Sequence, residues 1–484
     1  MTTTIGDIIG DELKQIKENI KEYKDENSLK LENKKTVNKD VKSNLSKRVS
    51  LSKKKDGIQI PLELVTAVEA EAAESQKRRL LAEIWELERQ KRWQDILTLV
   101  YPLEEKYPLL VELELDHELR KKIAFALVRC SKHQKALELL LPILKKEPDN
   151  FMVAYSVAYA AYDALYLHKN RQLVLSQKEK QRLLSLAYEC FEKCTQIRGN
   201  SVNVYYRIGM LFKEIEDKPR QAIPMFEKAI NNWDSLTNDE KGKRHYERPK
   251  FIKSLYHLAS CCVKLSLPSK SLNLLKRLIK EDEASNFIKP VFKFFALGKT
   301  YFALNRFEEA LDYLRTAAAA SEGGRPPDYI IELTAGCLLM LKQPEKALAE
   351  IDRISLRYMR PYVRWRRSDI LVSLGRYEEA LKTLEGALDK DGISRHKTLL
   401  RMARINYRLG SFSKALSDAK RAASFYKQRY LNELHEALFL QSLCYIGMQR
   451  IDRARHILED LARQGFAYPG FNKALKQVRE SASF

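Results

Sequence analysis

The feature that most constrains the fold is a sequence unit that recurs along most of the chain. Residues 376–381 (RYEEAL) nearly repeat residues 306–311 (RFEEAL), and every unit can be aligned on one anchor residue. The ten anchors are Ile96, Ala136, Ala187, Ala222, Ser271, Ala310, Ala347, Ala380, Ala415 and Ala454. Seven of the nine separations between successive anchors lie between 33 and 40 residues. A period of this length predicts stacked supersecondary units that bury their apolar faces against one another.

The pattern inside one unit indicates two antiparallel helices. Small residues at Gly298 and Ala310 would let two helices approach closely, and Tyr301 and Leu314 would fill the space between successive pairs. In this spacing the unit resembles the tetratricopeptide repeat, over roughly residues 78–470. The resemblance implies an all-α, right-handed superhelical solenoid of about ten antiparallel helix pairs. A generic helical bundle would not keep the spacing, and the RYEEAL form favours this repeat over the related half-a-repeat scaffolds of RNA processing.

The rest of the chain is organised around this array. The two longest separations, before Ala187 and before Ser271, predict insertions that form extended helices or polar surface loops. We expect an amphipathic helix with a disordered basic arm at 1–60, a leading helix at 61–90, the solenoid at 78–470 and a C-terminal tail at 471–484. The arm could dock on a partner, fold back on the solenoid, touch a membrane or only aid solubility. Partner docking is the favoured interpretation, and acidic residues within the helix disfavour the membrane.

The composition points to an acidic partner and a reducing compartment. The formal charge is +22, from 86 basic and 64 acidic residues, which favours an acidic protein surface or peptide, a nucleic acid or an anionic lipid. The seven cysteines do not have the spacing of a disulfide framework. Neither a signal peptide nor a run of 18 apolar residues is present. We therefore expect reduced thiols and a cytoplasmic location.

A basic, aromatic stretch in the last third is the candidate binding site. Residues 353–429 hold 19 basic and 7 acidic side chains, a net charge of +12. The resemblance implies that set positions of each first helix line a concave surface. In the eighth and ninth units, these positions and the arginines beside them give the predicted partner-binding residues: Tyr362, Trp365, Arg366, Lys397, Arg401, Arg404, Tyr407 and Arg408. Arginine forks pair with carboxylates or phosphates, and aromatic faces stack on bases or apolar groups. The alternative is internal pairing of these arginines with Asp369, Glu378 or Glu379.

Motifs of catalysis or cofactor binding are missing from the sequence. It contains no Gly-x-x-x-x-Gly-Lys-Ser/Thr phosphate loop and no histidine pair at zinc-protease spacing. Cys190 and Cys194 are interpreted as packing residues of one helix. We predict no catalytic, cofactor-binding or metal-binding residues, and a protein-interaction scaffold or adaptor that assembles a multiprotein complex. Nucleic-acid binding through the arginine and aromatic groove is the alternative, and an enzyme would need a site formed only in three dimensions.

Overall fold

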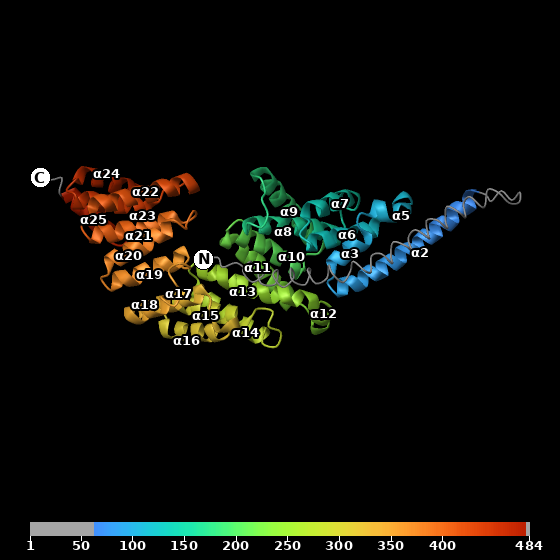
Figure 1. The fold of residues 1–484 in the computed structure, drawn as a ribbon, viewed down its shortest axis with the longest axis horizontal. Helices are drawn as coiled ribbons and strands as arrows, with labels where there is room; N and C mark the ends of the chain where they lie inside the picture. Colours follow the sequence, from blue (N-terminus) through green and yellow to red (C-terminus); the bar gives the residue numbers. More distant parts are fainter. Residues whose placement is uncertain (1–61, 481–484) are drawn as a thin grey trace. The chain divides into compact units, whose positions relative to one another are not determined.

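The computed structural model describes the backbone of residues 62–480 and the side chains of residues 69–480. The N-terminal arm predicted at 1–60 lies outside the described residues. The described residues form α-helices and no strand, which confirms the predicted all-α class (Figure 1). They divide into two compact units between Cys261 and Cys262. No helix in the described range is both long and apolar enough to cross a membrane.

Short helices joined by tight turns make up both units (Figure 1). The N-terminal unit contains α2 (Leu62–Arg89), α3 (Trp93–Val100), α4 (Leu103–Lys106), α5 (Pro108–Glu112), α6 (His117–Arg129), α7 (His133–Lys146), α8 (Phe151–Lys169), α9 (Gln177–Ile197), α10 (Val202–Met210), the π-helix η1 (Leu211–Ile215), α11 (Pro219–Asp234), α12 (Asn238–Lys243) and the 3-10 turn η2 (His245–Glu247). α13 (Arg248–Lys264) begins in this unit and ends in the next. The C-terminal unit continues with α14 (Pro268–Glu281), α15 (Pro290–Ala303), α16 (Phe307–Ala319), the 3-10 turn η3 (Glu322–Gly324), α17 (Asp328–Met340), α18 (Pro344–Ile351), α19 (Pro361–Ser373), α20 (Tyr377–Leu388), α21 (Arg395–Arg408), α22 (Phe412–Tyr430), α23 (His435–Gly447), α24 (Ile451–Arg463) and α25 (Phe471–Glu480).

The burial pattern confirms the alignment of the repeats. The ten anchors lie on α3, α7, α9, α11, α14, α16, α18, α20, α22 and α24, and each has a relative exposure of 0%. In most units the residue twelve positions before the anchor is also small and buried, as for Ala124, Ala259, Gly298, Ala335, Ser368, Ala403 and Ser442. Small side chains at both positions allow the two helices of a pair to pack closely.

The turn between the two helices of a pair has one conformation in nearly all units. The residue five positions before the anchor has a φ between 57° and 74° in nine units: Lys91, Ser131, Asp217, Ser266, Asn305, Lys342, Gly375, Gly410 and Gln449. After Gly375, the N–H of Arg376 donates to the carbonyl oxygen of Leu371 at 2.9 Å, which is a Schellman cap. Only two of the nine positions are glycine, so the close packing of the pair holds the other seven in a conformation that costs about 1–2 kcal/mol.

One unit departs from the common spacing by a single residue. Ahead of Ala222 the small residue is Gly209, thirteen positions earlier, and the π-helix η1 between them accommodates the additional residue. Gly209 is required by a close approach, because a Cβ atom there would lie 2.6 Å from the ring of Phe226 on α11.

Gly209→Ala is therefore expected to destabilise the N-terminal unit by about 1–3 kcal/mol, because Phe226 is fully buried and its ring has no room to move. Gly242→Ala on α12 is the matched control, since nothing lies within 4 Å of the added carbon. Alanine is the better helix former, so the control is expected to be neutral or slightly stabilising. Urea denaturation measures both variants, and equal midpoints would contradict the close approach.

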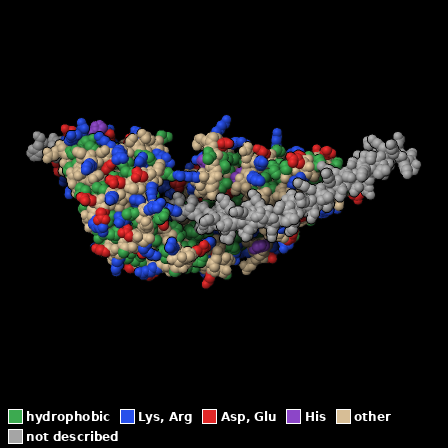
Figure 2. Space-filling view, in the orientation of Figure 1, with side chains coloured by type: hydrophobic (Ala, Val, Ile, Leu, Met, Phe, Trp, Pro, Cys, Tyr) green, Lys and Arg blue, Asp and Glu red, His purple; other side chains and the backbone are tan. Residues whose placement is uncertain are grey.

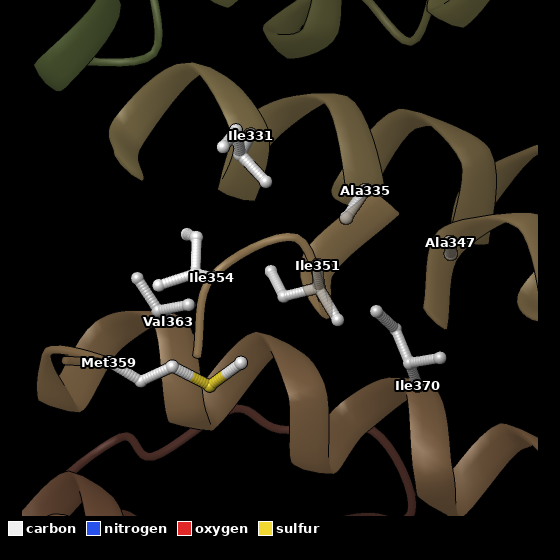
Figure 3. Close-up of a cluster of buried hydrophobic side chains, with 8 residues drawn as sticks. All are labelled: Ile331, Ala335, Ala347, Ile351, Ile354, Met359, Val363 and Ile370. Atoms are coloured by element: carbon white, nitrogen blue, oxygen red, sulfur yellow. The ribbon is translucent and has the colours of Figure 1, made fainter. Parts of the chain in front are cut away.

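Successive units share one hydrophobic core, as Figure 3 shows for the C-terminal unit. The cluster contains Ile331 and Ala335 of α17, Ala347 and Ile351 of α18, Val363 and Ile370 of α19, and Ile354 and Met359 of the connecting segment. The second helix of one pair thus packs against the first helix of the next, which is the nearest-neighbour packing of a repeat array.

The two insertions differ in form. Before Ala187, the added residues lengthen α8 and α9 to 19 and 21 residues. Before Ser271, the added residues form α12 and η2. Both forms agree with the expected extended helices and polar surface segments.

Candidate functional site

The eight predicted partner-binding residues lie on two neighbouring helices of the C-terminal unit. α19 carries Tyr362, Trp365 and Arg366, and α21 carries Lys397, Arg401, Arg404, Tyr407 and Arg408. α19 and α21 contact each other, as do α15 and α17, α17 and α19, and α21 and α23. The first helices of successive pairs therefore form one continuous layer, which we call the first-helix layer. The structure brings all eight residues together on this layer.

Two of the arginines in the layer are paired with carboxylates on the preceding first helix. Arg366 Nε on α19 lies 2.8 Å from Glu332 Oε1 on α17. One pair further along, Arg401 Nε on α21 lies 3.2 Å from Asp369 Oδ1 on α19. These ion pairs hold the two guanidinium groups in place. The layer therefore exposes fewer unpaired positive charges than the net charge of +12 for residues 353–429 suggests.

Arg404 pairs in the opposite direction, with the following first helix. It forms an ion pair with Glu436 of α23, and it donates a hydrogen bond to the Tyr468 hydroxyl at 3.1 Å. That hydroxyl in turn donates to Glu436 Oε1 at 2.9 Å. The internal pairing left open by the sequence is therefore present, and Asp369 is one of its expected partners. The partly exposed pairs of Arg401 and Arg404 contribute about 0–1 kcal/mol each to stability.

Trp365 lies against two cations of α21. Its indole Nε1 donates to Thr398 Oγ1 at 2.7 Å, which fixes the orientation of the ring. Lys397 Nζ and Arg401 Cζ lie 5.7 and 5.2 Å from the ring centroid. These are cation–π distances, so the ring face on which a partner could stack is already partly occupied.

The remaining predicted residues divide into packing and exposed groups. Tyr362 packs against the cluster of Figure 3, and burial raises the pKa of its hydroxyl. Tyr407 packs beside Phe412, with ring centroids 5.5 Å apart. Lys397 and Arg408 are exposed, and neither forms an ion pair with any described residue. These two are the predicted cations most accessible to a partner.

The densest basic run, residues 357–367, contains an arginine with a structural role. Arg364 is 8% exposed and donates to the carbonyl oxygens of Leu356, Thr383 and Met359 at 2.6, 3.3 and 3.4 Å. Its guanidinium lies against the backbone of Gly386, where any side chain would collide with it. Arg364 thus holds the connection between α18 and α19 in place and is not available to a partner.

The surface in Figure 2 agrees with this distribution of charge. On the visible face of the C-terminal unit, basic and acidic side chains are interspersed, and no broad area carries one sign. Arg367 adds to the internal pairing, because its Nε lies 2.7 Å from Asp352 Oδ1. The net charge of the stretch therefore does not gather into a single patch on this face.

A second group of cations and aromatic rings, which the sequence analysis missed, lies on first helices of the N-terminal unit. The tyrosines of α8 at positions 155, 159, 162 and 166 follow one helix face, with neighbouring ring centroids 6.1 to 6.5 Å apart. Arg207 Cζ on α10 lies 4.6 Å from the Tyr159 centroid, 5.0 Å from that of Tyr162 and 5.7 Å from that of Tyr206. The spacing of four, three and four residues between tyrosines was the available sequence signal. We call the following residues the tyrosine–cation cluster: Tyr159, Tyr162, Tyr206, Arg207, Lys250 and Lys253.

The two lysines of the cluster are half-buried and carry charge without a carboxylate paired to it. Burial and the nearby charges of Arg207, Lys253 and Arg129 lower the pKa of Lys250 to about 7. The pKa of Lys253 is lowered by burial and by Arg207. Within the described side chains, neither lysine forms an ion pair. Uncompensated burial of this kind disfavours the charged form of a lysine.

The lowered pKa of Lys250 predicts a pH-dependent stability. An unfolded lysine keeps its proton up to a pKa near 10.5, whereas folded Lys250 loses it near pH 7. Because the unfolded state binds more protons in this window, stability rises with pH, by about 1.5 kcal/mol between pH 7 and 8.5. Lys250→Met is therefore expected to be more stable than the wild type at pH 7, with a difference that shrinks as pH rises. Urea denaturation across this range measures the effect, and a constant difference would contradict it.

The described side chains contain no group of three or more His, Cys, Asp or Glu residues that could hold a metal ion. The seven cysteines form no disulfide bond in the described part of the chain, and six of them are buried. Burial raises the pKa of Cys190 to about 11 and that of Cys194 to about 12. Both thiols therefore stay protonated and unreactive near neutral pH.

Models of known protein families match the C-terminal unit. Residues 295–357 and 366–429 match one model described as a tetratricopeptide repeat, and residues 436–464 match a second with the same description. The chain contains tetratricopeptide repeats. Upstream of residue 295, the helix pairs share the buried anchors and the turn conformation of these repeats.

Solved structures with a similar fold include three tetratricopeptide-repeat or related proteins. One is a tetratricopeptide repeat protein from Parabacteroides merdae, with 12% identity, coverage of 58% of this chain and 100% of that chain, and a TM-score of 0.42. A thermophilic TPR protein of Thermus thermophilus has 20% identity, coverage of 43% and 99%, and a TM-score of 0.34. Yeast Tom70 has 14% identity, coverage of 85% and 96%, and a TM-score of 0.41. Likenesses this low say nothing of function, and no curated protein matches the sequence.

Proposed function

We propose that this tetratricopeptide-repeat protein is a non-catalytic scaffold or adaptor that assembles a multiprotein complex in the cytoplasm. Tetratricopeptide repeats generally mediate protein–protein interaction. The observation that carries the proposal is the first-helix layer, a continuous surface built from neighbouring helices of successive units. The partner is proposed to bind the first-helix layer of the solenoid at 78–470. The main contact is expected in the basic C-terminal third of that solenoid. Seven free cysteines are typical of a reducing compartment and support the cytoplasmic location.

The partner is proposed to be a protein with an acidic surface or peptide. Lys397 and Arg408 supply accessible positive charge on this layer. A nucleic acid is the weaker candidate. Binding its phosphate backbone would require a row of unpaired lysines and arginines along the layer. Three arginines of the layer already pair with internal carboxylates, namely Arg366, Arg401 and Arg404.

The test is affinity capture of the full chain from its native cells, with and without nuclease, read by quantitative mass spectrometry. We expect a defined set of proteins that persists after nuclease treatment. Recovery that disappears together with the nucleic acid would overturn the scaffold and favour the nucleic-acid alternative.

A charge-reversal variant locates the binding surface. Lys397→Glu/Arg408→Glu, on the first-helix layer, is expected to lower recovery of the captured proteins by about tenfold or more, because each reversal replaces attraction by repulsion. Lys382→Glu/Lys414→Glu makes the same change of charge at exposed positions of the second helices α20 and α22. Equal losses in both variants would assign the effect to net charge and not to this surface.

A further inference from the structure

The tyrosine–cation cluster of the N-terminal unit combines charge and burial in a way that the packing of the repeats does not require. Lys250 Nζ lies 5.3 Å from the centroid of the Tyr206 ring. Arg207 is half-buried among tyrosine rings, and its Nε atom is buried without a hydrogen-bond partner. Three cations from α10 and α13 are thus gathered at one place of the unit.

Of the two neighbouring carboxylates, Asp163 on α8 faces the positive charges of Arg207 and Arg129, and Glu214 pairs with lysines outside the cluster. Asp163 also lies 3.4 Å from His133 Nε2, but burial lowers the pKa of that histidine, which is therefore neutral near pH 7. Glu214 on η1 lies 2.6 Å from Lys169 Nζ and also pairs with Lys213. The charges that influence Lys250 are all positive, and come from Arg207, Lys253 and Arg129. The cluster therefore keeps a net positive charge in a partly desolvated setting, where an added anion interacts strongly.

The tyrosine rings explain how the protein tolerates Arg207 and what else the cluster can bind. Cation–π contacts with three rings offset part of the desolvation of the guanidinium. Tyr162 and Tyr206 are 3% and 5% exposed, so of the three rings only the partly exposed ring of Tyr159 can contact a bound chain. An arginine fork beside two ammonium groups matches carboxylates in particular, because the fork binds them bidentately.

From this juxtaposition we propose that the tyrosine–cation cluster binds an acidic peptide segment of a protein partner, with glutamate or aspartate side chains seated between Arg207, Lys250 and Lys253. This inference rests on the proposed scaffold function and adds a second contact site, in the N-terminal unit, to that of the C-terminal third. The carboxylates of the peptide supply counter-charge to Lys250 and Lys253, which form no ion pair with the described residues.

The test measures the binding of labelled probes to the full chain by fluorescence anisotropy at constant ionic strength. The probes are a fluorescein-labelled octaglutamate, an octaglutamine of the same length and a single-stranded oligothymidylate. We expect octaglutamate to bind the wild type at least about tenfold more tightly than octaglutamine, because the charge-assisted contacts are lost with the amides. Equal binding of the two peptides, or tighter binding of oligothymidylate, would overturn the proposal.

Variants assign the binding to the cluster. Lys250→Met/Lys253→Met is expected to weaken octaglutamate binding by about tenfold or more, since it removes two of the three cations. Lys145→Met/Lys146→Met, at exposed positions of the second helix α7, changes the net charge equally and is expected to leave binding unchanged. Arg207→Lys keeps the charge but removes the fork, so it tests the same site if the double variant is unstable. Unchanged affinity in both cluster variants would contradict the site.

The pH profile gives a readout that a structural role of Lys250 would not produce. A bound carboxylate favours the charged lysine, so binding above pH 7 requires the uptake of one proton. Affinity for octaglutamate is expected to fall as pH rises from 7, by at most about tenfold per pH unit. The profile should become shallower in Lys250→Met, where Lys253, whose pKa is also lowered, remains, and a flat wild-type profile would exclude Lys250 from the site.

The outcomes separate this inference from the proposed function. If the wild type captures proteins from cells but does not bind octaglutamate, the scaffold stands and the acidic-peptide site fails. If the wild type captures no protein, the scaffold itself fails, whatever the peptide does.

Discussion

Replacing Asp282 with alanine is expected to destabilise the C-terminal unit by about 3–5 kcal/mol. Asp282 is fully buried between α14 and α15. Its carboxylate accepts hydrogen bonds from the N–H groups of Phe287 and Ile288 at 2.8 and 2.9 Å, and Lys293 Nζ lies 2.9 Å from Oδ2. Alanine would leave Lys293, which is 5% exposed, without its carboxylate, and two backbone donors without an acceptor.

Urea denaturation of the full chain, followed by the fluorescence of Trp365 after Trp85, Trp93 and Trp233 have been replaced by phenylalanine, measures this loss. Trp365 is the one tryptophan of the C-terminal unit, so its signal reports on that unit. Asp312→Ala is the matched control, because Asp312 forms an exposed pair with Arg315 (side chains 75% and 71% exposed). The control should change stability by less than about 0.5 kcal/mol. A similar loss in both variants would mean that burial of the Asp282 pair contributes nothing.

The repeat architecture could be predicted because its signal is local and repeated. Eight of the ten anchors are alanine, as Ala310 and Ala380 are, and seven of the nine separations lie between 33 and 40 residues, so a comparison of the sequence with itself finds them. Their complete burial in the structure follows from the close approach that the spacing implies. The shift at Gly209 could not be predicted, because a π-helix adds one residue without leaving a sequence motif.

The fate of individual charges could not be predicted from the sequence. Arg364, Arg366 and Arg367 stand within four positions of one another, yet the first donates to backbone carbonyls while the others pair with carboxylates. Their partners lie up to 34 residues away, on neighbouring helices. A charge count adds these arginines together, whereas the packing of helices decides which of them remain available to a partner.

The tyrosine–cation cluster could not be predicted either, because its residues come together only in the folded chain. Two of its tyrosines, Tyr159 and Tyr162, belong to the periodic row on α8, but its cations come from α10 and α13, about 40 to 90 residues further along the chain. Each residue alone is an ordinary member of a first helix. Only the stacking of units brings Arg207 over Tyr159 and places Lys250 beside Tyr206.

Replacing Arg366, which pairs with Glu332, is the second substitution expected to lower the stability of the C-terminal unit strongly. Glu332 is 3% exposed at its side chain, and its Oε2 atom has no hydrogen-bond partner, so Arg366 supplies its main compensation. Arg366→Leu leaves this carboxylate buried, and we expect a loss of about 3 kcal/mol at pH 8. Arg408→Leu, at an exposed position of the same layer, should cost less than about 0.5 kcal/mol.

The pH dependence and a double variant distinguish buried charge from lost packing. Burial already raises the pKa of Glu332, and removal of Arg366 would raise it further. In the Arg366→Leu variant the folded state then binds more protons than the unfolded state above the ordinary pKa of glutamate, so its stability falls as pH rises. The deficit relative to wild type should therefore shrink as pH is lowered towards 5, and Glu332→Leu/Arg366→Leu should recover most of it at pH 8. A deficit that is independent of pH and persists in the double variant would mean that Arg366 acts through its packing against α17, and that its charge is free for a partner.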